Sequence, residues 1–508
     1  MNKFIKLIGA VAIINVVARV FGFLREMIIA YQFGTGHTSD SISTAYMIPN
    51  FLYLVVGGAF TTVFISIYNR ESTDKGLFVK QSFTIVAVTA TIMTLIGMIF
   101  ADPILDSFKT DKIVSEEEVA LTRDLYLWMM PSSIFLVLSS WYSGLLNVNQ
   151  KFHLSSFAIL IYNAVFLLIA VVLSQTIGPI GYGISAFASA ILMVYFLVIG
   201  YRKLDSFKVG LSFKQNVSTK ELWIMVVPIM LGGATVQLYA LLQRYIAGLL
   251  SLEGAVSSVN YASKLMQFPQ AILITAVTTV IYPILSQKEA DNDHASIKSL
   301  YSKGLHYLLL LLAPVTIFSY FYSTSLIQVV FEYSNFNAKS TAATAPVLAV
   351  FVLSMYFLAA NGYITRFYYA KGDSMAPVIF SLLNVFGVNI AVIFLMVDST
   401  GVVSIAWGTL ISSIVNFIML VVYASIKYDL KMGIFSKELQ FFRALPPLIV
   451  ITIVMYFSSE YLVFDNKWVT FIVGLVIFSA VLAGSYLLFG VKEVKEFSDK
   501  LKRKLLKQ

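Results

Sequence analysis

The sequence of 508 residues contains no cysteine and only four histidines, which are His37, His153, His294 and His306. The absence of cysteine excludes disulfide bonds, zinc ribbons and thiol nucleophiles, and no two of the histidines show metal-ligand spacing. Charged residues make up 12% of the chain, which is about half of the ~25% usual in soluble proteins. We therefore expect no metal, no cofactor and no soluble catalytic domain.

Apolar residues dominate what is present, since 58% of the chain is hydrophobic and the mean hydropathy is +0.82. A helix that crosses a bilayer needs about 20 mostly apolar residues. The sequence predicts an all-α membrane protein with about 14 transmembrane helices, a number counted from apolar runs along the chain. These runs lie near residues 5–33, 39–68, 81–101, 124–147, 154–175, 180–201, 221–250, 256–286, 302–322, 341–368, 375–396, 401–426, 440–459 and 467–490.

The distribution of the basic residues predicts the orientation of these helices. If the N-terminus is cytoplasmic, 27 of the 36 lysines and arginines fall on the cytoplasmic side and five on the outer side. Such an excess is typical of the positive-inside rule, so we expect both termini in the cytoplasm and the first helix retained. The net charge of +9 then reflects a surface that faces anionic lipid and not nucleic acid.

An internal repeat predicts two related halves. Ala59, Thr61, Thr62 and Val63 recur 217 residues later as Ala276, Thr278, Thr279 and Val280, and Asn163 is echoed by Asn384. Parallel repeats of this kind surround a central cavity in many transporters. The predicted organisation is a six-helix lobe over 1–205, a second over 216–430, two additional helices over 436–490 and a basic cytoplasmic tail over 491–508.

Among the charged residues of the predicted spans, the candidates for a functional site are Arg19, Arg25, Glu26, Asp40, Arg244 and Lys264. A charge at the centre of a bilayer costs about 2.5–3.5 kcal/mol on insertion scales, so it usually faces a partner or a water-filled cavity. Structural ion pairing, snorkelling at helix ends and helix capping are the simpler explanations for single members. The four cations gather in the first, seventh and eighth spans, which favours a central cationic cavity and an anionic, phosphate-bearing cargo.

Glycine and proline in the same spans predict places where helices bend. The candidate hinge residues are Gly22, Pro49, Gly57, Gly58 and Pro269. Close packing of small residues between membrane helices is the alternative reading of the glycines. The sequence contains no Walker motif and no nucleophile–base pair, so an enzyme is the function class that we expect least.

The segment "ARVFGFLREMIIAYQFGTGHTSDSISTAYMIPNFL" resembles the MurJ (MviN) family of lipid II flippases, in the multidrug/oligosaccharidyl-lipid/polysaccharide exporter superfamily. A second, looser resemblance is "AVSSVNYASKLMQFPQAILITAVTTVIYPILS" at 255–286, where the family usually reads Y-A-D-R-L-x-x-F-P. The residues that match the first pattern are Arg19, Gly22, Phe23, Arg25, Glu26, Phe33, Gly34, Asp40, Pro49 and Asn50.

The resemblance implies two lobes around a cationic cavity and a groove for a polyprenyl tail on the last two helices. It implies that Arg19, Arg25 and Lys264 bind the pyrophosphate of the cargo, with Glu26 and Asp40 also in the site. Lys264 stands where the family has arginine, and Ser263 replaces the usual acid. With Arg244 and Asn163, the predicted substrate-binding residues are Arg19, Arg25, Glu26, Asp40, Asn163, Arg244 and Lys264.

These features predict a flippase that moves lipid-linked peptidoglycan precursor (lipid II) across the bacterial inner membrane by alternating access. The expected partners are lipid II, membrane lipids and proteins of cell-wall synthesis. The departures at Ser263 and Lys264 leave another polyprenyl-pyrophosphate glycan open as the cargo. A cation-coupled drug or solute exporter, which would need an acidic cavity, and a membrane scaffold are the further alternatives.

Overall fold

The computed structural model describes residues 3–70, 74–107, 115–204, 207–214, 217–250, 254–291, 293–432 and 444–491. Residues 492–508 of the predicted tail, and Lys109, Lys112, Lys437 and Arg443 of the charge count, lie outside these ranges. Every regular element among the described residues is helical, which confirms the predicted all-α fold. The chain divides into two compact units, residues 1–260 and 261–508, whereas the lobe boundaries inferred from the repeat stay a prediction.

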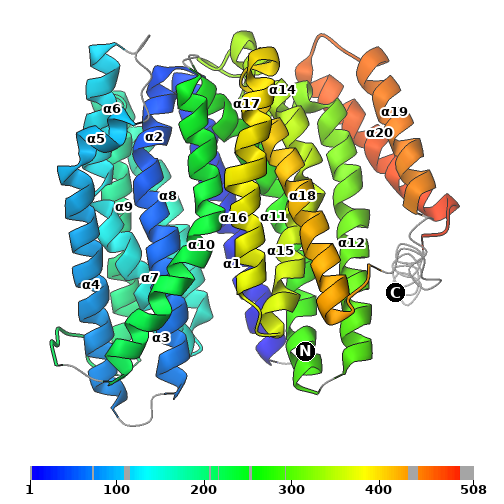
Figure 1. The fold of residues 1–508 in the computed structure, drawn as a ribbon. Helices are drawn as coiled ribbons and strands as arrows, with labels where there is room; N and C mark the ends of the chain where they lie inside the picture. Colours follow the sequence, from blue (N-terminus) through cyan, green and yellow to red (C-terminus); the bar gives the residue numbers. More distant parts are fainter. Residues whose placement is uncertain are drawn as a thin grey trace. The chain divides into compact units, whose positions relative to one another are not determined.

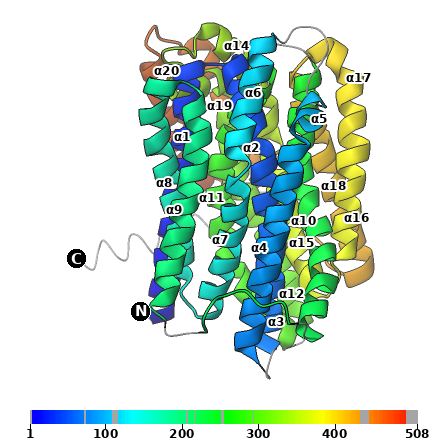
Figure 2. The ribbon, with the colours of Figure 1, turned by 90° about the vertical axis from the view of Figure 1, so that its left-hand side faces the viewer.

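In the first unit, two predicted spans consist of more than one helix. The second span is interrupted by a π-helical segment, η1, that begins three residues after Pro49. The elements of this unit (Figures 1 and 2) are α1 (Lys3–Phe33), α2 (His37–Phe51), η1 (Leu52–Gly57), α3 (Gly58–Arg70), α4 (Lys75–Ile99), α5 (Ala101–Asp106), α6 (Glu116–Met129), α7 (Ser132–Val148), α8 (Phe152–Ile177), α9 (Ile180–Arg202), α10 (Val217–Leu249) and the first turns of α11 (Ala255–Ala290).

The second unit holds the rest of α11 and the helices that follow it. One of its spans is bent by 42° between α14 and α15, and another contains the π-helical segment η2. Its elements are α12 (His294–Phe321), α13 (Ser323–Phe331), α14 (Ala338–Leu353), α15 (Met355–Ala370), α16 (Met375–Leu383), η2 (Asn384–Asn389), α17 (Ile390–Thr400), α18 (Val403–Tyr428), α19 (Leu445–Tyr461) and α20 (Lys467–Leu488).

Each predicted span coincides with one of these helices or with consecutive helices. Among the described residues, nine helical stretches are long and apolar enough to cross a membrane, and the bent pair α14–α15 brings the number to ten. The chain is therefore a multi-pass membrane protein. The predicted total of about 14 is compatible with this architecture.

The first unit packs α1 against α8 and α8 against α9, which run side by side in Figure 2. The short turn between α8 and α9 contains Gly178 at φ +64°, a conformation that glycine adopts without a steric penalty. Small residues on α9 allow the close approach, because a Cβ at Gly181 would lie 2.8 Å from the backbone of α8. This close packing of small residues is typical of membrane helices. It makes α8 and α9 a tightly packed pair, and α1 packs against α8.

Residues 207–214, which lie between α9 and α10, pack against α4 (Figure 2). The backbone N–H of Ser212 donates to Thr84 Oγ1 at 2.8 Å. The Gln81 side-chain amide donates to the Lys214 carbonyl oxygen. These bonds from two side chains on α4 hold the linker that leads into α10.

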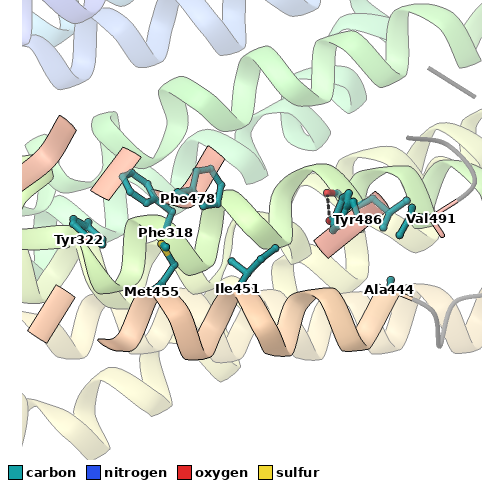
Figure 3. Packing of buried hydrophobic residues seen from close by; sticks show 9 residues of the cluster. Phe318, Tyr322, Ala444, Ile451, Met455, Phe478, Tyr486 and Val491 are labelled. Carbon is teal, nitrogen blue, oxygen red and sulfur yellow. Dashed lines mark hydrogen bonds between the residues drawn. The ribbon is translucent and has the colours of Figure 1, made fainter. Parts of the chain in front are cut away.

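In the second unit, α19 and α20 pack on α12 through a cluster of buried hydrophobic residues, four of which are aromatic (Figure 3). Phe318 stacks on Tyr322 with ring centroids 5.0 Å apart and contacts Phe478 at 4.9 Å. The Tyr322 hydroxyl hydrogen-bonds to Ser458 Oγ at 3.0 Å, and the Tyr486 hydroxyl donates to the Leu310 carbonyl oxygen at 2.8 Å. Buried tyrosines thus attach the last two helices with hydrogen bonds as well as apolar contacts.

The packing of Tyr322 on α20 predicts that Gly474→Ala lowers thermal stability. A Cβ at Gly474 would clash with the Tyr322 ring, and the stack on Phe318 and the bond to Ser458 prevent the ring from moving away. Overpacking of this kind costs about 1–3 kcal/mol. Thermal denaturation of the purified protein should show the loss.

Gly484→Ala on the same helix is the matched control, because nothing lies within 4 Å of its added Cβ. Equal melting temperatures for the two variants would contradict the described packing of α20.

Candidate functional site

Arg25 lies near the end of α1 with its side chain only 10% exposed. Its Cζ atom lies 4.9 Å from the ring centroid of Tyr46 on α2 and 4.9 Å from that of Phe166 on α8. The two rings contact each other nearly edge to face at 6.3 Å, and the Tyr46 hydroxyl lies 3.1 Å from that of Tyr162. Cation–π contacts therefore hold the guanidinium in place from two neighbouring rings.

A chain of hydrogen bonds joins Arg25 to a second arginine on α10. Arg25 Nη2 donates to Glu26 Oε1 at 3.0 Å. The other carboxylate oxygen, Glu26 Oε2, accepts from Asn260 Nδ2 at 2.9 Å. Arg244 Nη2 donates to Asn260 Oδ1 at 2.8 Å. We call these four residues (Arg25, Glu26, Asn260 and Arg244) the arginine relay.

The arginine relay carries more positive than negative charge. It contains two guanidinium groups, one carboxylate and one neutral amide, and Glu26 and Asn260 are only 5% and 3% exposed. A charge held among apolar helices is costly unless it is compensated. Guanidinium groups bind phosphate through paired N–H donors, so an anionic phosphate group is the ligand that this arrangement favours.

Asp40, in the first turn of α2, binds the start of α11. Its Oδ1 accepts the backbone N–H of Ser257 at 2.7 Å, so it satisfies one of the donors that a helix N-terminus leaves open. The preceding Gly254 has φ +76°, and a Cβ there would lie 2.7 Å from the Thr35 carbonyl oxygen. Asp40 thus fixes the turn of α11 that leads into Asn260.

Asn163 and Gly22 lie at the packed interface of α8 with α1. Asn163 Nδ2 donates to the Ala18 carbonyl oxygen at 3.2 Å, and its side chain would be 3.5 Å from a Cβ at Gly22. The contact shown for Asn163 is to the α1 backbone and not to a member of the arginine relay. Asn163 therefore orients the helix that carries Arg25.

The two remaining predicted cations lie elsewhere. Arg19 is exposed on α1, two turns before the arginine relay. Lys264 is half-buried on α11, in the second unit. The structure thus brings Arg25, Glu26 and Arg244 together in one network, whereas Arg19 lies on an exposed part of α1.

The predicted hinge residues of the second span lie at or near the π-helical segment η1, of which Gly57 is the last residue. Pro49 is buried inside α2 and has no N–H for the helical ladder. Gly57 packs tightly on α7, because a Cβ there would lie 2.6 Å from Ser140 Oγ, whereas nothing lies within 4 Å of one at Gly58. Pro269 lies within α11 in the second unit. π-helical turns are common where helices bend or serve a function.

Sequence reasoning missed Asn260, Tyr46 and Phe166. Asn260 could have been noticed as an amide within an apolar helix, four residues before Lys264. The two aromatic residues gave no such signal, because aromatic side chains are frequent in this chain, which has 40 phenylalanines and 28 tyrosines. Their contact with Arg25 arises only when three helices pack together.

Comparison with known proteins places the chain in a family of membrane proteins. A family model described as "Lipid II flippase MurJ" matches residues 29–479. The "Probable lipid II flippase MurJ" of Rickettsia prowazekii is 26% identical over 483 residues, which cover 92% of this chain and 95% of the relative. The "Lipid II flippase MurJ" of Burkholderia cenocepacia is 27% identical over 390 residues, 74% of this chain and 75% of the relative.

Solved structures share the fold. "Lipid II flippase MurJ, inward closed conformation" matches with a TM-score of 0.82 at 21% identity, over 95% of this chain and 99% of that one. An inward-facing multidrug resistance MATE family transporter matches with a TM-score of 0.68 at 12% identity, over 82% and 99% of the two chains. The predicted resemblance to the family and its superfamily is confirmed.

The ring contacts of Arg25 predict that Tyr46→Leu lowers stability by about 0.5–2 kcal/mol through the lost cation–π contact, in addition to the lost hydroxyl bond. Tyr46→Phe, which keeps the ring, should lose less. A double-mutant cycle with Arg25→Gln, followed by thermal denaturation, isolates the pairwise energy. A coupling energy near zero would show that the ring does not hold the guanidinium.

Alanine substitutions at Gly57 and Gly58 distinguish a role of these glycines in helix packing from a role in helix bending. Gly57→Ala should lower the melting temperature because Ser140 must move, at a cost of about 1–3 kcal/mol. Gly58→Ala should leave stability unchanged or slightly raised, since alanine favours a helix by about 1 kcal/mol. If η1 bends during function, Gly58→Ala should reduce activity without loss of stability. Unchanged activity would argue against a hinge at this position.

Proposed function

Because this chain belongs to the lipid II flippase MurJ family, we infer that it moves lipid II from the cytoplasmic to the outer leaflet of the bacterial inner membrane by alternating access. The family match covers residues 29–479, and the relatives align along most of their own length. The observation that carries the proposal is the arginine relay, which places an excess of positive charge inside a bundle of apolar helices.

The chemistry of the cargo explains why a transporter keeps this costly group. Lipid II carries a pyrophosphate between a polyprenyl tail and a polar head group. The negative pyrophosphate compensates Arg25 and Arg244, so the charged site becomes stable when the cargo is bound. We assign Arg19 and Lys264 as further cations along the path of the head group, and Glu26, Asp40 and Asn163 as residues that hold the site in shape.

The tail of the cargo stays in lipid, and α19 and α20 offer a surface for it. Both helices carry large exposed apolar side chains on the faces that do not pack on α12. These residues are Ile449, Ile453, Phe457, Ile472, Leu475 and Val476. We propose that they form the groove for the polyprenyl chain, with both termini of the protein in the cytoplasm as the distribution of lysine and arginine indicates.

Alternating access requires helices that can bend. The segments η1 and η2 and the 42° break between α14 and α15 interrupt the regular hydrogen-bond ladder, so they are the places where bending costs least. A drug exporter is the second candidate because MATE transporters share the fold. The excess positive charge of the arginine relay counts against cationic drugs as the cargo.

Neutralising Arg25 should slow transport about tenfold or more while the protein still inserts. A lost bidentate phosphate contact is worth about 1.5–3 kcal/mol, or roughly tenfold to a hundredfold in rate or affinity. Arg25→Ala should therefore fail to support growth of cells depleted of their native flippase. It should also slow head-group translocation of lipid II in proteoliposomes.

Arg123→Ala is the matched control. Arg123 pairs with Asp102 at 2.7 Å, and its side chain is 47% exposed, so its loss should leave growth and translocation unchanged. Normal growth with Arg25→Ala at normal membrane levels would refute the cationic site. Transport of cationic drugs without transport of lipid II would favour the exporter.

A further inference from the structure

We propose that Asn260 is a positioning residue that links Glu26 to Arg244 without adding negative charge. This inference rests on the proposed function, because it explains how the site stays open to a pyrophosphate. Asn260 lies in the second turn of α11 and is 3% exposed. It connects α11 to both α1 and α10 through side-chain hydrogen bonds.

The two neighbours of Asn260 define how its amide is oriented. A carboxylate can only accept, and a guanidinium can only donate. The amide nitrogen must therefore face Glu26 Oε2, at 2.9 Å, and the amide oxygen must face Arg244 Nη2, at 2.8 Å. Asparagine is a short side chain that offers a donor and an acceptor side by side, so it satisfies both neighbours at once.

Other residue types at position 260 would disturb the charge balance. An aspartate would accept from Arg244, but it would place a second carboxylate oxygen where Glu26 Oε2 now finds a donor at 2.9 Å. It would also cancel the excess positive charge of the arginine relay. A lysine or arginine would bond Glu26 but repel Arg244. An apolar side chain would leave both buried groups without these bonds.

The neutral side chain of Asn260 also affects how easily an anionic ligand displaces the present hydrogen-bond partners of Arg25 and Arg244. A hydrogen bond between two opposite charges includes a Coulomb attraction that a hydrogen bond from a charged group to a neutral group lacks. Arg25 is bonded to the carboxylate of Glu26, whereas Arg244 is bonded to the uncharged oxygen of Asn260. A pyrophosphate therefore displaces a weaker partner at Arg244 than at Arg25, so Arg244 is the arginine that engages the incoming anion first.

The test uses three variants of the full chain: Asn260→Asp, Glu26→Gln and the double variant. Asn260→Asp should weaken binding of inorganic pyrophosphate, measured by calorimetry on the purified protein, at least tenfold and slow lipid II translocation equally. The double variant moves the carboxylate from position 26 to position 260, so the number of charges is conserved and each hydrogen bond keeps one donor and one acceptor, with the bond between positions 26 and 260 reversed in direction. It should return pyrophosphate affinity to within about threefold of the original protein.

Asn337→Asp is the control for an added carboxylate. Asn337 caps α14 by accepting the backbone N–H groups of Lys339 and Ser340, and aspartate caps equally well, so pyrophosphate affinity should not change. If Asn260→Asp binds pyrophosphate as the original protein does, the inference is wrong. A double variant that is weaker than both single variants would also overturn it, because it would show a purely structural role.

The failure of the proposed function would look different. If the original protein binds pyrophosphate and the double variant recovers that binding, but neither moves lipid II, the charge role of Asn260 stands and the flippase assignment falls. If the original protein moves lipid II and Asn260→Asp moves it equally fast, the flippase assignment stands and the role of Asn260 falls.

Discussion

Compensation of buried charge is the constraint on which the rest of the first unit depends. The two carboxylate oxygens of Glu26 accept hydrogen bonds from Arg25 and Asn260, and the Asn260 side chain accepts one from Arg244. The bonds work only if α1, α10 and the start of α11 stay in register. The capping of α11 by Asp40 and the bond from Asn163 to the backbone of α1 supply that register. Polar contacts thus decide how these helices are placed, although most of their surface is apolar.

The second unit achieves its packing by different means. Its described contacts between α12, α19 and α20 centre on aromatic rings, and tyrosine hydroxyls find a carbonyl or hydroxyl partner. Rings pack with little loss of side-chain freedom and bury a large area. The attachment of the last two helices therefore needs no ion pair, and it leaves apolar side chains of α19 and α20 exposed toward lipid.

The fold was largely predictable because spanning helices leave a strong signal in hydropathy, and each predicted range falls on helix over the residues that the structure describes. Arg25, Glu26 and Arg244 were predictable for a related reason, since a charge in an apolar run is conspicuous. Asn260, Tyr46 and Phe166 were not, because amides and aromatic rings occur throughout the chain and only tertiary packing selects these three. Pro49, Gly57 and Gly58 predicted a place where the second span bends, but the π-helical turns η1 and η2 themselves escaped prediction, because a π-helical turn depends on local packing more than on composition.

The π-helical segment η1 has a geometric consequence for α3. A π-helical turn holds about one residue more than an α-helical turn, and each α-helical residue advances the chain by about 1.5 Å and turns it by about 100°. If η1 became regular α-helix, α3 would therefore rotate about its own axis by roughly a quarter turn. A slip of a single peptide unit at Leu52–Gly57 is enough to present a different stripe of α3 to its neighbours without unfolding the helix.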